Sequence, residues 1–119
     1  MKHQKRYAKL NLAGPHRRAM LRNQVITFID NGSLTTTRAR AKEVRRFAEK
    51  LVTLARGGNT FLNRQRAKAL LPYKDESLVK LFTEIAPQYK DRPGGYTRIL
   101  LLGRRISDTA EIARLEWVS

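Results

Sequence analysis

Cysteine is absent from this chain of 119 residues. Its absence excludes a disulfide framework, a zinc site built on thiolates and a cysteine nucleophile. The only two histidines, His3 and His16, lie in a basic start and at a helix start, a spacing that argues against a shared metal site. No apolar run approaches the roughly 18 residues that span a bilayer, and no secretory signal is recognisable. We therefore expect a cytoplasmic protein with no metal ion and no membrane partner.

Acidic residues are scarce. Ten of them stand against 25 lysines and arginines, which gives a net charge of +15 and an isoelectric point of about 11.1. The imbalance is concentrated in residues 1–68, where 17 basic residues face three acidic ones, whereas residues 69–119 hold eight and seven. A chain with this charge repels itself, so we expect a polyanionic partner. Arginines outnumber lysines 16 to 9, which weakly favours RNA over DNA.

Motifs for catalysis are also missing. The chain has no glycine-rich phosphate loop ending in Lys-Ser or Lys-Thr, no dinucleotide fingerprint and no nucleophile elbow. Its acidic residues form no obvious pair suited to general acid–base chemistry. We therefore expect no enzyme activity, no cofactor and no small-molecule substrate.

The stretch 34–58, LTTTRARAKEVRRFAEKLVTLARGG, is the most informative part of the chain. It predicts a short strand, a threonine cap and a helix of about five turns that ends at a pair of glycines. At 100° per residue, one side of this helix is apolar and the other is mostly basic. The apolar side requires a core, and the basic side predicts an anionic partner. The apolar residues are Ala41, Val44, Phe47, Ala48, Leu51, Leu54 and Ala55, and the basic ones include Arg38, Lys42, Arg45, Arg46 and Arg56.

Residues 1–14 form a basic arm with too few apolar residues to fold alone. A solvated terminus is the simplest interpretation of such a segment. The high charge of the whole chain favours instead an arm that becomes ordered on contact with nucleic acid. In that interpretation Lys2, Lys5, Arg6 and Lys9 neutralise phosphates, and the rings of His3 and Tyr7 stack on bases.

Three further helices are predicted. The first spans residues 16–30, begins at Pro15 and ends at Asn31-Gly32, and its early turns carry Arg17, Arg18 and Arg22. The second spans residues 61–71 after a cap at Asn59 or Thr60, with Leu62, Ala67, Leu70 and Leu71 as its core candidates. The third begins at Asp75 and ends at Pro87, with a stripe formed by Leu78, Val79, Phe82 and Ile85.

The C-terminal part predicts two strands. Pro93-Gly94 fits the central pair of a type II turn. Residues 97–102 form a dense apolar run, for which we expect a strand buried on both faces, followed by Arg104 and Arg105. Ala113, Leu115 and Trp117 alternate with Arg114, Glu116 and Val118, which predicts a half-exposed strand with Trp117 in the core. Together with the short first strand, these elements indicate an α+β fold: a small three-stranded sheet packed with about four helices, forming one domain over residues 15–119.

Four segments of the chain closely match a known family. They are the start MKH…KLN, HRRAMLRN at residues 16–23, the stretch 34–58 and IAPQYKDRPGGYTRILLLG at residues 85–103. In their order and spacing the chain resembles, from end to end, the bacterial large-subunit ribosomal protein seventeen family. The resemblance implies an α+β, RNA-binding structural protein of the large ribosomal subunit. It implies contact with 23S rRNA near the polypeptide exit, with neighbouring large-subunit proteins as further partners.

The resemblance also implies which residues contact RNA. By position these are Lys2, His3, Lys9, Asn11, His16, Arg17, Arg22, Thr36, Thr37, Lys42, Arg45, Tyr96 and Arg98. The charge pattern adds Lys5, Arg6, Arg18, Arg38, Arg46, Arg104 and Arg105 as RNA-binding candidates.

Two other functions are compatible with parts of the sequence. The charge alone would permit a non-specific DNA-compacting protein, which would prefer duplex DNA to structured RNA. An enzyme that acts on nucleic acid is disfavoured because the catalytic groups are missing.

Overall fold

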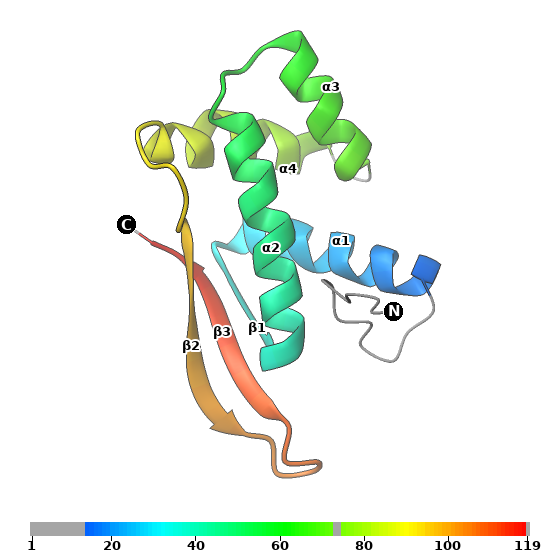
Figure 1. The fold of residues 1–119 in the computed structure, drawn as a ribbon. Helices are drawn as coiled ribbons and strands as arrows, with labels where there is room; N and C mark the ends of the chain where they lie inside the picture. Colours follow the sequence, from blue (N-terminus) through cyan, green and yellow to red (C-terminus); the bar gives the residue numbers. More distant parts are fainter. Residues whose placement is uncertain (1–13, 73–74, 119) are drawn as a thin grey trace, which may run out of the picture.

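A small antiparallel sheet runs through the protein in the computed structural model, which describes residues 14–72 and 75–118 (Figure 1). Its strands are β1 (Ser33–Thr37), β2 (Thr97–Arg104) and β3 (Glu111–Trp117), in the order β1-β3-β2. Leu34 of β1 and Ile99 of β2 both pair with Leu115 of β3, so these side chains share one face of the sheet. The predicted α+β architecture with three strands is confirmed.

The central helix α2 (Arg38–Ala55) packs on this face of the sheet (Figure 1). The Thr37 hydroxyl accepts a hydrogen bond of 3.4 Å from the Arg40 backbone N–H, which confirms the predicted threonine cap. The predicted apolar side of α2 is buried, except that Phe47 and Leu54 are only half-buried at its margin. Since a helix of this length gains most of its stability from packing, this side fixes α2 against the sheet and its neighbours.

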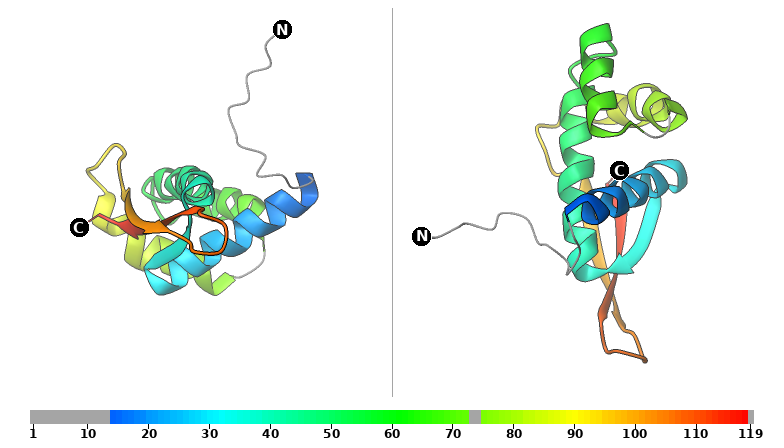
Figure 2. Two further views of the ribbon diagram at one scale, coloured as in Figure 1. Left: turned by 90° about the horizontal axis from the view of Figure 1, so that it is seen from below. Right: turned by 90° about the vertical axis from the view of Figure 1, so that its right-hand side faces the viewer.

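Helix α1 (Gly14–Asn31) crosses α2 and contacts β1 (Figures 1 and 2). Its end is set by Gly32, which has a φ of +82° and donates its N–H to the carbonyl of Phe28 at 2.9 Å. Phe28 is fully buried and stacks on Trp117 with ring centroids 4.2 Å apart. The predicted helix and the core position of the tryptophan ring are thus confirmed, although Trp117 keeps part of its surface exposed.

The remaining helical segments differ from prediction in their ends and their exposed side chains. Helix α3 (Phe61–Leu70) begins at the predicted Thr60 cap, but Phe61 and Leu62 in its first turn are exposed. Helix α4 (Asp75–Lys80) continues as a π-helical turn (Leu81–Ile85) and a 3₁₀ turn (Ala86–Tyr89). The helical segment therefore does not end at Pro87, because this proline lies in the first turn of the 3₁₀ segment, where no N–H donor is needed. Val79, which we placed in the apolar stripe, is exposed.

Strand β2 contradicts the prediction of burial on both faces. Leu100, Leu101 and Leu102 are 42%, 58% and 55% exposed, because the β2–β3 hairpin extends beyond the helices that cover the start of the sheet (Figure 2). The predicted type II turn at Pro93-Gly94 is also wrong. Gly94 has a φ of +154° and Gly95 a φ of +65°, and the two glycines form a wider bend before Tyr96.

Candidate nucleic-acid interface

A row of cations runs along α2 from the β2–β3 hairpin, where Arg38 lies 3.3 Å from the Glu111 carboxylate of β3, to Lys50. Arg38, Lys42, Arg46 and Lys50 follow one another at intervals of four residues and are all exposed. Four residues advance a helix by about 6 Å along its axis, so the row presents one cation for roughly every helical turn. An open hollow of about 430 Å³ beside it is lined by Lys42, Arg45, Arg46 and Glu49. We call Arg38, Lys42, Arg46 and Lys50 the α2 basic row.

Lys50 was missed by the sequence analysis. Helical periodicity could have identified Lys50 as a candidate, since it lies one turn after Arg46 on the same side of the helix. It also lines a second hollow of about 300 Å³ between α1, α2 and α3, together with Leu21 and Phe47. The middle of the row and its Lys50 end therefore lie beside hollows in the surface.

Arg45 is half-exposed and partly committed to the fold. Its guanidinium lies 3.6 Å from the Glu49 carboxylate and donates a hydrogen bond of 3.4 Å to the carbonyl of Thr97 at the start of β2. Glu49 in turn accepts hydrogen bonds from the backbone N–H and the hydroxyl of Thr97, at 3.1 and 2.7 Å. Arg45 thus joins α2 to the sheet as well as contributing charge beside the row.

The predicted RNA-binding arginines of the β2–β3 hairpin are paired with carboxylates. Arg98 binds the Glu116 carboxylate at 2.6 Å. Arg104 lies 3.9 Å from Glu111 and donates a 3.2 Å hydrogen bond to the carbonyl of Thr109. These contacts reduce the net positive charge that the hairpin presents to a phosphate.

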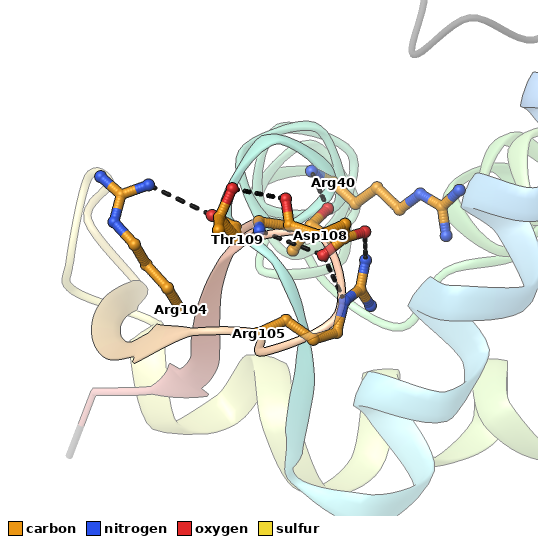
Figure 3. A network of polar contacts seen from close by, with 7 residues as sticks. Arg40, Arg104, Arg105, Asp108 and Thr109 are labelled. Atoms are coloured by element: carbon orange, nitrogen blue, oxygen red, sulfur yellow. Dashed lines mark hydrogen bonds and ion pairs between the residues drawn. The ribbon is translucent and has the colours of Figure 1, made fainter.

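The tip of the hairpin contains a bidentate ion pair between Arg105 and Asp108 (Figure 3). Arg105 donates two hydrogen bonds to the Asp108 carboxylate, at 3.0 and 2.8 Å, and the Ala110 backbone N–H donates a third at 3.1 Å. These hydrogen bonds, chiefly that from Arg105, lower the pKa of Asp108 from 3.8 to about 2, and the same pair raises the pKa of Arg105. Thr109, with a φ of +56°, completes the tight turn.

Four predicted contact residues have structural roles in the fold. Tyr96 is a correction: its ring is fully buried against Tyr89, and its hydroxyl lies 3.2 Å from that of Thr53, so it offers no surface to RNA. Thr37 caps α2, and the half-buried Thr36 accepts a 3.3 Å hydrogen bond from the Gln24 amide. Arg22 is half-buried and donates a 3.1 Å hydrogen bond to the carbonyl of Leu70, which ties α1 to the end of α3.

The start of α1 carries the remaining described candidates. His16 and Arg18 are exposed and Arg17 is half-exposed. The predicted arm contacts Lys2, His3, Lys5, Arg6, Lys9 and Asn11 lie outside the described residues. Over residues 14–72 and 75–118, no group of acidic or histidine side chains is arranged to hold a metal ion. In the same part of the chain, no helix has the length and apolar character to cross a membrane.

Comparison with known proteins gives a consistent answer. The profile of the family described as ribosomal protein L17 matches residues 20–118. The large ribosomal subunit protein bL17 of Thermoanaerobacter sp. (strain X514) is 53% identical over 113 residues, which cover 94% of this chain and 98% of that protein. The bL17 proteins of Desulforudis audaxviator and Syntrophus aciditrophicus are 50% identical over 112 residues and 46% identical over 119 residues. The first match covers 94% of this chain and 98% of the Desulforudis protein, and the second covers 99% of this chain and 93% of the Syntrophus protein. This chain belongs to the ribosomal protein L17 family.

Proposed function

We propose that the chain is a structural component of the large ribosomal subunit that binds 23S rRNA near the polypeptide exit and has no catalytic step of its own. Membership of a ribosomal protein family makes it a cytoplasmic component of the ribosome that supports translation. In the proposal, residues 1–14 act as an RNA-binding arm and residues 15–119 as one α+β domain. Neighbouring large-subunit proteins are the further partners.

The observation that carries the proposal is the α2 basic row. Its cations stand on a helix whose opposite side is buried, so the fold holds them in place before RNA arrives. Like charges at four-residue spacing oppose helix formation slightly, which indicates that the row serves binding rather than stability. Exposed His16 and Arg18 at the start of α1 would extend this surface toward the arm. Phosphate contacts of this kind position a protein on RNA without reading its sequence.

Charge reversal on the row tests the proposal. We expect Lys42→Glu to weaken binding to a 23S rRNA transcript by about tenfold, since it removes one phosphate contact and adds a repulsive charge. The matched control is Lys90→Glu, which makes the same change at an exposed position outside the row. Filter binding of the purified variants, with circular dichroism to verify folding, measures the difference. Equal losses for the two variants would show that only total charge matters.

Competition with DNA tests the class of nucleic acid. The proposal predicts that structured 23S rRNA displaces duplex DNA from the protein, and that protection of the rRNA from hydroxyl radicals is confined to a few segments. Preference for the duplex would instead support a DNA-compacting protein.

A further inference from the structure

The end of the β2–β3 hairpin is unusually apolar for the surface of so basic a protein. Leu101 and Leu102 are more than half exposed, and Ile106 at the tip is 99% exposed. The hairpin extends away from the described helices (Figure 2), which agrees with the exposure of these side chains. Several exposed apolar side chains in one segment of a protein surface indicate a site where a partner binds and excludes water.

The backbone of β2 is open along the same segment. β2 is an edge strand, because β3 lies between it and β1. The hydrogen bond of 2.9 Å from the Val118 N–H to the Tyr96 carbonyl fixes the alternation of the ladder. Tyr96, and with it Arg98 and Leu100, direct their backbone N–H and C=O groups toward β3. The same groups of the residues between them, Thr97, Ile99 and Leu101, therefore point to the open edge.

Of these three edge positions, only Thr97 has hydrogen-bond partners for its outward backbone groups among the described residues. The Thr97 N–H donates to Glu49 and its carbonyl accepts from Arg45, both from α2. The outward groups of Ile99 and Leu101 have no hydrogen-bond partner among residues 14–72 and 75–118. Natural proteins usually protect such an edge with charged side chains, proline or a β-bulge, and in β2 the segment from Ile99 to Leu102 contains no charged residue and no proline. Its only irregularity is the register shift between Leu101 and Gly103.

The charge of the hairpin argues against RNA as the partner of this edge. Arg105 is balanced by Asp108, and Glu111 is shared between Arg104 at 3.9 Å and Arg38 of α2 at 3.3 Å. Residues 97–117 hold four arginines and three acidic residues, and each of these arginines lies in an ion pair, so phosphates meet a nearly neutral surface here. A second copy of the chain is also disfavoured as the partner, because two molecules with a net charge of +15 repel each other.

We infer that the open edge of β2 from Ile99 to Leu102 binds an extended segment of another large-subunit protein, which adds to the sheet as a fourth strand. Backbone hydrogen bonds to Ile99 and Leu101 would set its register, and the exposed leucines would cover its apolar side chains. This inference rests on the proposed ribosomal role but uses a surface separate from the α2 basic row.

Photo-crosslinking in assembled subunits tests the inference. A benzophenone amino acid replaces Leu100, whose own backbone groups face β3, and crosslinks are mapped in salt-washed large subunits. Leu101→Pro removes one outward N–H without breaking a bond to β3, whereas the matched control Leu101→Ala keeps that N–H. Leu101→Lys, which puts a charge on the edge and leaves the backbone intact, is the second variant if the proline variant does not fold.

The expected result is a crosslink to one extended segment of a single large-subunit protein. It falls about tenfold in Leu101→Pro or Leu101→Lys and less than about twofold in Leu101→Ala, because only the first two disturb the edge. Crosslinks to rRNA, to a second copy or to nothing would overturn the inference, as would a protein crosslink that the edge variants leave unchanged. Binding of the free chain to 23S rRNA should be unaffected by Leu101→Pro, so a failure of the proposed RNA-binding role is detected separately.

Discussion

Individual acidic side chains hold several arginines and the start of β2 in place. Glu49 binds both Arg45 and the start of β2, and Glu116 binds Arg98 at 2.6 Å and Arg114 at 3.4 Å. Exposed ion pairs of this kind contribute little to stability singly. Their effect here is to fix side-chain positions.

Asp108 provides a residue-level prediction. Its native pKa of about 2 lies below the usual 3.8, so the ion pair with Arg105 is complete above about pH 4 and is lost as the pH falls through about 2. We expect an NMR titration of the Asp108 carboxyl to give a midpoint near 2. In Arg105→Gln the midpoint should rise toward 3.8. A native midpoint already at 3.8 would contradict the bidentate pair.

The aromatic core gives a second prediction. Phe28 is fully buried on Trp117, so Phe28→Ala should lower the free energy of unfolding by about 3–5 kcal/mol. Phe47 lies half-buried on α2, so the matched Phe47→Ala should lower it by about half as much. Urea unfolding of the two variants measures the difference. A larger effect at Phe47 would mean that the packing of α1 on β3 is wrongly assigned.

Among the elements, helices with strong local signals were predictable and exposed apolar segments were not. The Thr37 cap and apolar side of α2 and the glycine end of α1 all matched the structure, since caps and periodicity act within a few residues. The run at residues 97–102 appeared doubly buried because composition cannot show that a strand extends past its covering helices. The same limit applies to Leu62 and Val79, whose burial depends on how α3 and α4 meet.

The site was predictable in outline for the same reason. Periodicity placed Arg38, Lys42 and Arg46 on the outer side of α2, and the structure confirms that they are exposed. Tyr96 was assigned wrongly because its burial depends on Tyr89, which approaches from a separate segment of the chain. Pairing of the hairpin arginines with Glu111 and Glu116 likewise depends on strand register, which the sequence alone does not specify.

The cap of α2 gives a prediction at the level of one element. Thr37→Ala removes the hydroxyl that accepts the Arg40 N–H, and we expect it to lower the free energy of unfolding by about 1 kcal/mol. Thr35→Ala, at an exposed position in β1, serves as the control and should change it by less than about 0.5 kcal/mol. Thermal melts followed by circular dichroism compare them. Equal effects would argue against a capping role for Thr37.

For the molecule as a whole, charge is divided between a binding half and a nearly neutral half. Residues 1–68 carry 17 basic and three acidic residues, and they include the arm, α1 and the α2 basic row. The nearly neutral remainder supplies two of the three strands and much of the core. Binding through phosphates should therefore dominate the affinity for RNA.

Salt dependence checks this division. If roughly six to ten phosphates are neutralised, affinity for 23S rRNA should fall by about three orders of magnitude or more between about 50 mM and about 200 mM salt. Titrations at several salt concentrations give the slope directly. An affinity that does not change with salt would show that phosphate contacts are not the main source of binding.

The most direct test of the ribosomal role is sedimentation of the tagged protein from cells. The chain carries a C-terminal tag, the extract is separated on a sucrose gradient, and the large subunits are washed in high salt. We predict one tagged chain for each washed large subunit, held by RNA and protein contacts together. Recovery of the tag mainly with DNA or as free protein would contradict the account.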